Sequence, residues 1–467
     1  MATERMRSQV NQITEGVIWK QLLLFFFPIL LGSFFQQMYN TADTIIVGRF
    51  AGTLALAAVG ATGSYVNLLF GFFVGVASGA TVILAQFCGA ENQKGMHDAV
   101  HTGIAMSILF AVFITVVGIA TAPAMLRAMN VPEDVYHGAV TYIRIFFCGM
   151  LALIIYNVGS GILRALGDSR RPLYFLVASC LANVVLDLLF VAVFKMGVAG
   201  AAIATVMAQV FSAVLVVICL MRQKGAGRLI IKEIRIERSV LKSILHIGIP
   251  GGLQSVMYSL SNMIIQTAIN GFGSATVAAW TAMGRLDGIV WLVMGAFGTS
   301  ITTFVGQNFG AQKYDRMRQS TRICLVMAVC STAVLSLVIC LFGRHLMALF
   351  TGDEAVLDIG VQLIRCISPF YTAYVCVEIL AGTIRGTGDS VRPVIVLAIC
   401  TCLVRVIWVS ICTRMFDSFT YVAISYPMTW ALTSAVFVVY YLRGKWLKRR
   451  IMIMGYRPDT RGKAHAS

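Results

Sequence analysis

Twelve long apolar stretches, separated by short polar breaks, follow one another along this chain. A bilayer core about 30 Å thick requires roughly 20 consecutive apolar residues in one helix, and each stretch meets that length. The predicted spans are residues 18–42, 54–86, 98–122, 138–164, 173–194, 198–221, 244–270, 275–307, 318–343, 355–384, 393–416 and 420–442. The sequence therefore predicts an all-α polytopic membrane protein of about twelve transmembrane helices.

The composition excludes most other classes of protein. Hydrophobic residues make up 58% of the chain and charged residues only 12%, whereas a soluble globular chain carries roughly 25% charged residues. The first apolar stretch continues into Gln36, Gln37 and Asn40 without a small-residue cleavage site, so it is predicted to be a span and not a cleaved signal peptide.

The net charge of +17 is interpreted as a topology signal. Most Lys and Arg residues fall on one side when the N-terminus, the even-numbered breaks and the C-terminal tail are placed together. The positive-inside rule makes that side cytoplasmic. We therefore expect a multi-pass protein of the cell (inner) membrane with both termini in the cytoplasm and with anionic lipid around its basic side. The charges are spread over short loops, so we expect no nucleic-acid partner.

The sequence is written twice. Ser160–Pro172 reappears as Ala381–Pro393, and Gln86–Ala90 as Gln307–Ala311, both 221 residues further along. Six predicted spans separate each motif from its copy, so the two copies have the same orientation in the membrane. This predicts two pseudo-symmetric six-helix lobes around a central cleft.

The repeat also predicts the domain organisation, which is an N-lobe over residues 1–221, a cytoplasmic linker over 222–243, a C-lobe over 244–442 and a basic cytoplasmic tail over 443–467. The duplicated Arg-x-x-Gly-Asp-Ser-x-Arg-Pro loops are expected to be structural. In them Gly and Asp close a turn, and Pro begins the next helix.

Several motifs together resemble the multidrug and toxic compound extrusion (MATE) transporter family. They are Asn40-Thr-Ala-Asp43 with Val47-Gly48-Arg49, Gln307-Asn-Phe-Gly-Ala311, the duplicated loops, and Asn183-Val-Val-Leu-Asp187. The resemblance covers nearly the whole chain. It implies an alternating-access secondary antiporter that uses H⁺ or Na⁺ to export amphipathic, mostly cationic small molecules. The wider superfamily includes lipid-linked oligosaccharide flippases, which supply the alternative function.

Ionisable side chains inside spans are costly and mark function by default. Asp43 lies on one face of the first span with Gln36 and Asn40, and Asp187 shares a face of the fifth span with Asn183. Two carboxylates with an amide would form an oxygen cage for Na⁺ or a site for a proton. The alternative is that Asp43 caps a helix end and Asp187 bonds nearby backbone.

Thr205 and Gln209 share a face of the sixth span, and the Thr205 hydroxyl is expected to join this cage. The resemblance implies that the cation-coupling residues are Asp43, Asn183, Asp187 and Thr205. The C-lobe is not a chemical copy, because the same offset places Trp408 where Asp187 stands.

Cargo binding is expected mainly from polar and aromatic residues of the spans facing the cleft. The seventh span carries a polar stripe with a residue every four positions, and Glu378 stands near Tyr371 and Tyr374 in the tenth span. An acid beside aromatic rings suits an organic cation, and a proton relay is the alternative. The predicted cargo-binding residues are Gln36, Asn40, Asn157, Gln254, Tyr258, Asn262, Tyr374 and Glu378.

Other chemistries find little support in the sequence. A Gly-x-x-x-x-Gly-Lys-[Ser/Thr] loop for ATP is absent, and so is a catalytic constellation at membrane depth, so we expect no enzyme. A flippase for pyrophosphate lipids would need several arginines in its cavity, but only Arg285 and Arg405 remain inside spans once the other Lys and Arg residues are assigned to the two sides of the membrane. His97 and His101 stand one turn apart and are interpreted as solvated helix-end residues, not as zinc ligands. No cofactor is expected beyond a possible Na⁺, and the protein is expected to be a monomer.

Overall fold

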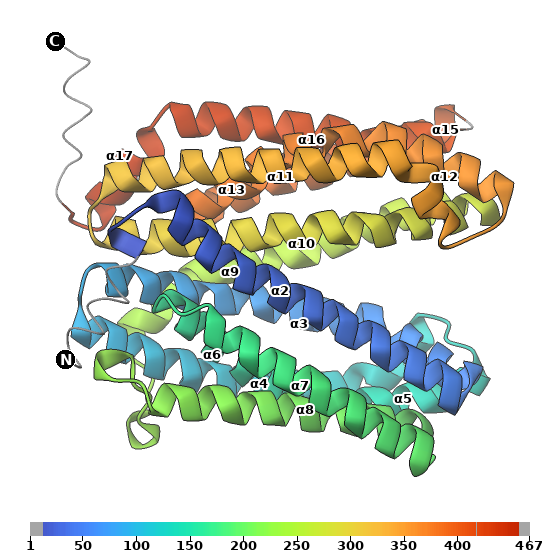
Figure 1. Cartoon of the computed structure of the whole chain (residues 1–467), viewed down its shortest axis with the longest axis horizontal. Helices are drawn as coiled ribbons and strands as arrows, with labels where there is room; N and C mark the ends of the chain where they lie inside the picture. Colours follow the sequence, from blue (N-terminus) through green and yellow to red (C-terminus); the bar gives the residue numbers. More distant parts are fainter. Residues whose placement is uncertain (1–12, 417, 457–467) are drawn as a thin grey trace. The chain divides into compact units, whose positions relative to one another are not determined.

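The computed structural model describes residues 13–416 and 418–456, and every regular element in them is helical. Figure 1 shows these elements in the colours of the sequence. The α-helices are α2 (Ile18–Ile46), α3 (Thr53–Gly89), α4 (Gln93–Ala128), α5 (Glu133–Cys148), α6 (Met150–Ala165), α7 (Arg170–Asp187), α8 (Gly197–Met221), α9 (Arg238–Asn270), α10 (Ser274–Gly310), α11 (Tyr314–Ala348), α12 (Glu354–Ile367), α13 (Tyr371–Gly386), α14 (Val391–Val396), α15 (Val404–Met415), α16 (Phe419–Leu442) and α17 (Lys445–Ile453). The predicted all-α fold is confirmed.

Shorter helical turns of other types join or extend these helices. The π-helical segments are η1 (Val47–Ala51), η2 (Leu188–Val193) and η6 (Leu397–Leu403), and the 3-10 turns are η3 (Gly225–Gly227), η4 (Ile231–Glu233) and η5 (Ser368–Phe370). Segment η2 begins directly after Asp187, and η1 follows four residues after Asp43. Single π-helical turns inside α-helices are frequent at functional sites.

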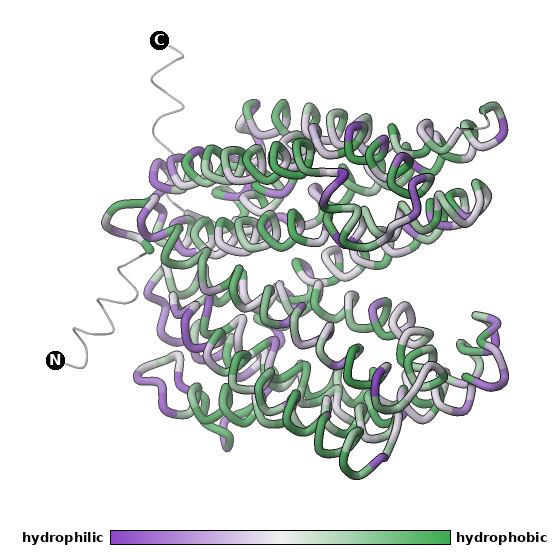
Figure 2. Tube along the Cα trace, turned by 45° about the vertical axis from the view of Figure 1, so that its right-hand side comes forward, coloured by the Kyte–Doolittle hydropathy of each residue, from purple (hydrophilic) through white to green (hydrophobic). Residues whose placement is uncertain are grey.

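The membrane-spanning lengths agree with the sequence pattern. Ten helical segments of the described chain are long and apolar enough to cross a membrane, and the pair α5–α6, bent by 47°, makes up to eleven. Helix α9 is 33 residues long but less apolar, because polar side chains such as Gln254 and Asn262 interrupt it. In Figure 2 hydrophobic residues line the lengths of the helices and hydrophilic ones gather near their ends.

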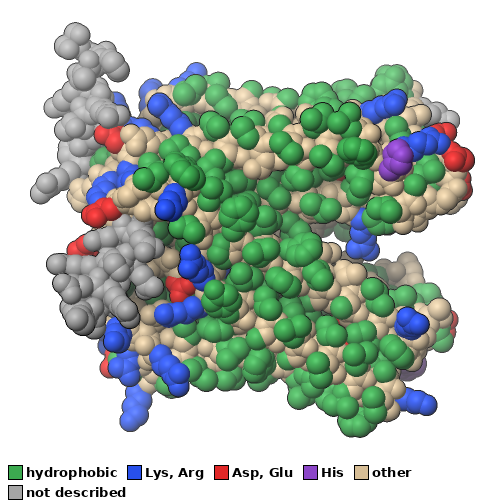
Figure 3. All heavy atoms as spheres, viewed as in Figure 1, with side chains coloured by type: hydrophobic (Ala, Val, Ile, Leu, Met, Phe, Trp, Pro, Cys, Tyr) green, Lys and Arg blue, Asp and Glu red, His purple; other side chains and the backbone are tan. Residues whose placement is uncertain are grey.

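The outer surfaces of the helices are apolar. On α11, Val334 is 62% exposed and Leu341 is 68% exposed. Figure 3 shows hydrophobic side chains over the flanks of the helices, with Lys and Arg mainly near helix ends. Water would penalise such exposure and lipid does not, so these flanks are interpreted as lipid-facing.

The chain forms two compact units. Of the described residues, one unit comprises Ile13 with Phe27–Gly252, and the other Thr14–Phe26 with the residues from Leu253 onward. The first turns of α2 therefore belong to the second unit, where the Phe26 ring stacks on Phe297 with 4.0 Å between ring centroids. The predicted linker belongs to the first unit.

The internal repeat is visible in the backbone. Helices α3 and α10 have the same length and begin 221 residues apart, at Thr53 and Ser274, and α6 and α13 match in the same way. Each of the first pair begins after a glycine with positive φ, which is 89° at Gly52 and 94° at Gly273. Glycine adopts this conformation without a steric cost from Cβ, so both copies use the same turn.

The duplicated loops act as helix starts. Asp168 Oδ1 accepts hydrogen bonds from the backbone N–H groups of Arg170 and Arg171, both at 3.1 Å, and its carboxylate pairs with the Arg171 guanidinium at 3.1 Å. In the second copy, Asp389 pairs with Arg392 at 3.0 Å. These contacts satisfy backbone donors at the start of the next helix, which is a structural role.

The linker is tied to the beginning of α4 by four contacts. The backbone N–H groups of Ile230 and Glu237 donate to His101 Nε2 at 3.1 Å and to Thr102 Oγ1 at 3.0 Å. Glu233 pairs with His97 at 2.8 Å, and Arg235 with Asp98 at 3.2 Å.

His101 is only 1% exposed, so the interpretation of both histidines as solvated was wrong for this one. The ring nitrogens and the Glu233 carboxylate lie within 4.8 Å of one another, the arrangement of a possible metal site. Both nitrogens of His101 already face backbone groups, the His97 carbonyl oxygen at 2.7 Å and the Ile230 N–H. The cluster is therefore explained as an attachment of the linker.

We expect Thr102→Val to open the linker. The substitution keeps the volume and leaves the partly buried Glu237 N–H without its acceptor, which costs about 1–1.5 kcal/mol and raises the open population roughly tenfold. Limited trypsin digestion at Arg228, Lys232 and Arg235 measures this population. Thr141→Val is the control, since the exposed Thr141 hydroxyl bonds only to His137 of its own helix. Equal digestion of the two variants would contradict the assignment.

Candidate functional site

A buried cluster of acids and polar groups lies inside the first unit. Helix α2 brings Asp43 to it, α7 brings Asn183 and Asp187, and α8 brings Thr205. All four side chains are buried, from Asp43 at 7% exposed to Asn183 and Asp187 at 0%. The structure therefore brings together the four residues predicted to couple the cation.

Two tyrosines complete the cluster. The Asp43 and Asp187 carboxyl groups interact with each other, and both lie within electrostatic range of Tyr142 from α5. The Tyr39 hydroxyl group approaches Thr205. Neither tyrosine was predicted. Tyr39 lies four residues before Asp43 on α2, so helical spacing was the available signal for it, while Tyr142 has none.

The polar atoms of this cluster lack ordinary partners. Asp43 Oδ1, both carboxylate oxygens of Asp187, both terminal atoms of the Asn183 amide and Thr205 Oγ1 are buried without a hydrogen bond of normal geometry among the described residues. Buried polar groups are nearly always satisfied, and an exception needs an explanation. An interpretation of Asp43 and Asp187 as helix-capping or backbone-bonding residues finds no such bond here.

The atoms present fit a small cation. Carboxylate, amide and hydroxyl oxygens are the ligands that hard cations prefer, and a bound Na⁺ would satisfy the partnerless oxygens together. A proton shared by the facing carboxyl groups would equally relieve their repulsion. The donor set thus accommodates either coupling ion.

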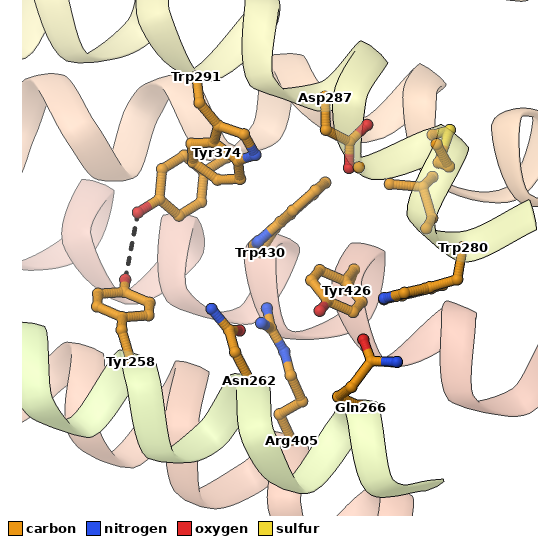
Figure 4. Close-up of a pocket in the computed structure, with 13 residues that line it drawn as sticks. Tyr258, Asn262, Gln266, Trp280, Asp287, Trp291, Tyr374, Arg405, Tyr426 and Trp430 are labelled. Carbon is orange, nitrogen blue, oxygen red and sulfur yellow. Dashed lines mark hydrogen bonds between the residues drawn. The ribbon is translucent and has the colours of Figure 1, made fainter. Parts of the chain in front are cut away.

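A second candidate site is a cavity of about 540 Å³ inside the second unit. Side chains of α9, α10, α12, α13, α15 and α16 surround it, and Figure 4 draws these lining residues as sticks. Its lining residues are Tyr258, Asn262, Gln266, Trp280, Met283, Gly284, Asp287, Trp291, Ile367, Tyr374, Arg405, Tyr426 and Trp430. Three of the six tryptophans of the chain are among them, so the cavity is suited to flat, apolar molecules.

The aromatic rings hold one another in place. Trp430 lies edge-on to Tyr426 with 5.6 Å between ring centroids, and Trp291 lies edge-on to Tyr374 at 4.7 Å. The hydroxyl groups of Tyr258 and Tyr374 share a hydrogen bond of 3.2 Å, drawn as the dashed line in Figure 4. A stiff aromatic wall binds a flat molecule with little loss of side-chain entropy.

One acidic and one basic side chain line the cavity. Asp287 of α10 accepts a hydrogen bond from the Tyr371 hydroxyl of α13. Arg405 of α15 is 3% exposed and lies over the Tyr426 ring, with 4.0 Å from its Cζ to the ring centroid. Among the described residues these two groups do not form an ion pair with each other.

The predicted cargo-binding residues divide into two groups. Tyr258, Asn262 and Tyr374 line the cavity. Glu378 does not, because its carboxylate turns to Arg385, at 3.4 Å on its own helix, and packs against Gly298. The acid that lines the cavity is Asp287, and the expectation that Glu378 binds cargo stays a prediction.

The remaining predicted cargo-binding residues lie elsewhere. Gln36 and Asn40 are exposed on α2. The Asn157 amide donates to the Leu153 carbonyl oxygen of its own helix at 2.8 Å, and Gln254 Oε1 is buried without a hydrogen bond of normal geometry among the described residues.

The sequence held an unused signal for the part of the cavity lining that α10 supplies. Trp280, Met283, Gly284, Asp287 and Trp291 recur at helical spacing on one face of α10. A face that combines tryptophans with an acid inside a span has no reason to contact lipid.

Comparison with known proteins places this architecture in a family. The family model described as MatE matches the chain twice, over residues 28–189 and 250–411, once for each repeat. The chain is 29% identical over 436 residues to the probable multidrug resistance protein YpnP of Bacillus subtilis, covering 93% of this chain and 97% of that one. It is also 24% identical over 361 residues to the FAD transporter of Shewanella oneidensis, covering 74% and 77%.

Solved structures share the fold. A MOP superfamily transporter from Pyrococcus furiosus, described as having a binding pocket of reverse polarity that suggests a different function, superposes with a TM-score of 0.88 at 23% identity and covers 94% of this chain and 98% of its own. A MATE family transporter in an outward-facing conformation also gives a TM-score of 0.88, at 22% identity and 94% and 98% coverage. With its twofold helical repeat and two family matches, this chain belongs to the MatE family of multidrug and toxic compound extrusion (MATE) transporters.

Proposed function

We propose that this transporter is a secondary antiporter in which inward movement of H⁺ or Na⁺ drives the export of amphipathic small molecules. The observation that carries the proposal is the pair of buried acids, Asp43 and Asp187. Among the described residues Asp43 Oδ1 and both carboxylate oxygens of Asp187 lack hydrogen bonds of normal geometry. Maintaining two carboxylates inside a membrane unit costs free energy that packing alone does not require. Binding and release of a cation at this cluster would explain why the two acids are present.

The negative charge of the cluster of Asp43 and Asp187 without a bound cation explains how ion binding and cargo binding are coupled. Without a cation, the facing carboxylates of Asp43 and Asp187 repel each other, and a bound cation removes the repulsion. Asp187 stands at the junction of α7 with the π-helical segment η2, and Asp43 lies shortly before η1. We infer that cation binding repacks α2 against α7 at these junctions and lowers the affinity for cargo, which gives exchange.

The ion gradient and the membrane potential supply the energy for export. Each net charge moving inward gains about 2.3 kcal/mol per 100 mV, which supports a concentration ratio of roughly fiftyfold, whereas a singly charged cationic cargo exchanged for one ion moves no net charge and is driven by the ion gradient alone. We propose an inner-membrane, monomeric protein with cytoplasmic termini. Residues 1–12 and 457–467, which carry those termini, lie outside the described residues.

The cargo is proposed to be aromatic, because its cavity has three tryptophans and three tyrosines. The resemblance to multidrug exporters favours mostly cationic cargo, and Asp287 supplies the acid that such cargo needs in the cavity. Relatives named as multidrug resistance proteins and as an FAD transporter show that cargo chemistry varies among similar chains.

The test is export of ethidium from proteoliposomes with Na⁺ and pH gradients imposed separately. We expect one gradient, or both, to drive ethidium movement against its own concentration. A flippase for a lipid-linked intermediate would leave ethidium unmoved under either gradient, and that result would overturn the proposal.

Thr205 distinguishes the two coupling ions. If Na⁺ is the ion, Thr205→Val removes one oxygen ligand and raises the half-saturating Na⁺ concentration about tenfold, equivalent to about 1.4 kcal/mol. Thr205→Ser keeps the hydroxyl and is expected to behave like wild type. If both variants keep the wild-type Na⁺ dependence, Thr205 does not ligate Na⁺.

A further inference from the structure

We propose that Arg405 is an oxyanion-binding residue of the aromatic cavity, which extends the cargo to flat aromatic molecules with a carboxylate or phosphate group. The proposal rests on the proposed function only in taking this cavity as the cargo site. It concerns a basic side chain of the second unit, whereas the acids Asp43 and Asp187 lie in the first unit.

The first observation is the burial of Arg405 without a counter-charge. The side chain is 3% exposed, and no carboxylate among the described residues pairs with it. A buried guanidinium inside a span that lacks an acidic partner is costly. An anion from outside the chain would offset this cost by pairing with the Arg405 guanidinium.

The second observation is how the guanidinium group is held. Its Nε and Nη2 atoms donate to Thr429 Oγ1 at 3.2 and 2.7 Å, and its plane is supported by the Tyr426 ring. Among the described residues Nη1 has no acceptor of normal geometry. Figure 4 shows the side chain pointing into the cavity toward Trp430. A guanidinium fixed in one orientation with a free N–H edge is arranged to bind an oxyanion.

The third observation is what surrounds this edge. The cavity of about 540 Å³ places Asn262 and Gln266, as neutral donors, and the rings of Trp280 and Trp430 around the same space. An inorganic anion would bind to the polar groups and leave the aromatic rings in contact with water. An aromatic anion uses both, since its ring stacks on tryptophan while its oxyanion pairs with Arg405.

Asp287 defines the other end of the cavity. Its carboxylate already accepts a hydrogen bond from the Tyr371 hydroxyl, and Figure 4 draws it on the opposite side of Trp430 from Arg405. An oxyanion therefore binds at the Arg405 end, away from the acid, and a cationic group of cargo binds at the Asp287 end. One cavity thus holds organic cations and aromatic anions in different orientations.

The experiment measures binding without any ion gradient. Wild type in phosphatidylcholine nanodiscs is titrated with flavin mononucleotide and riboflavin, which share one ring system and differ by a phosphate group, and with ethidium as a cation. Quenching of tryptophan fluorescence reports occupancy, because three of the six tryptophans line the cavity. We expect flavin mononucleotide to bind at least about tenfold more tightly than riboflavin, as a charge-assisted contact allows.

Arg405→Met is expected to remove this preference by weakening flavin mononucleotide about tenfold, with riboflavin unchanged and ethidium bound as tightly or more tightly. Arg405→Lys is expected to retain part of the preference, because it keeps the charge and loses the planar fork. Arg414→Met, which removes an exposed arginine from the same helix, is the matched control and is expected to keep the wild-type preference.

Three results would overturn the proposal. The first is a wild type that binds riboflavin as tightly as flavin mononucleotide, a comparison that needs no variant to fold. The second is a folded Arg405→Met protein that keeps the preference. The third is loss of flavin mononucleotide binding when phosphatidylglycerol is added to the nanodiscs, which would identify the oxyanion as a lipid headgroup. Ethidium export under a gradient tests the antiporter function separately, so the failure of one proposal is distinguishable from that of the other.

Discussion

Replacing Asp187 by asparagine is expected to abolish gradient-driven export. The substitution preserves the size of a side chain that is 0% exposed, so the packing of α7 and α8 should persist. It removes the negative charge that a bound cation neutralises, and the asparagine amide does not take up a proton near neutral pH. We expect ethidium export under Na⁺ or pH gradients to fall at least about tenfold, which corresponds to a loss of at least about 1.4 kcal/mol in ion binding.

The control for this variant is Glu133→Gln, which removes an exposed acid from the first turn of α5 in the same unit. It is expected to export ethidium at the wild-type rate. Asp43→Asn should resemble Asp187→Asn, because the two carboxyl groups interact directly. Undiminished gradient-driven export by folded Asp187→Asn protein would remove Asp187 from the mechanism.

Gly79→Val is expected to have the largest effect on stability. Helix α3 crosses the beginning of α9 so closely that a Cβ at Gly79 would overlap the Ile244 carbonyl oxygen and lie 2.9 Å from the Gly248 nitrogen. Both neighbours are backbone atoms of a helix, so neither moves aside as a side chain would. Overpacking of this kind costs about 3 kcal/mol or more, and glycine at such crossings lets membrane helices approach.

Thermal unfolding of detergent-solubilised protein, followed by size-exclusion chromatography, measures the Gly79→Val effect. We expect a large loss of monodisperse protein and a lower unfolding temperature. Gly63→Val is the matched control on the same helix, since no atom outside its immediate neighbourhood lies within 4 Å of a Cβ at that position. If both variants were equally stable, the close crossing would not contribute to stability.

Helical spacing explains why the buried cluster around Asp43 and Asp187 was predictable. Asn183 and Asp187 share a face whatever α7 packs against, and an acid inside a span must turn away from lipid. Those two facts select Asp43, Asn183 and Asp187 before any packing is known. Tyr142 was not predictable, because it comes from α5, and spacing along one helix does not say which neighbouring helix will approach.

The residues that line the cavity of the second unit could not be selected by helical spacing alone. Glu378 and Asp287 are both acids inside spans, and the sequence does not distinguish them. The structure does, because Arg385 lies within reach of Glu378 on the same helix while Asp287 faces the aromatic lining. Likewise Arg405 counted only as an isolated arginine until Tyr426 and Thr429 of α16 were seen to hold it.

The two repeats share a backbone and differ in charge. The position of Asp187 in the first repeat is Trp408 in the second, and the position of Arg405 is Val184 in the first. Equivalent helices therefore place an acid inside the span of one unit and an arginine inside the span of the other. This asymmetry is readable from the sequence, and it agrees with our proposal that the coupling ion and the cargo bind in separate places.

The sequence by itself determined the class of the fold, its duplication and the faces of the helices, because apolar length, a repeated motif and a period of 3.6 residues act within single helices. Only the tertiary structure decided which faces meet and how deeply they are buried. The rotation and closeness of two packed helices depend on the shapes of both surfaces, as at Gly79 and Gly248. The partnerless state of the acid oxygens and the orientation of Arg405 are properties of those contacts.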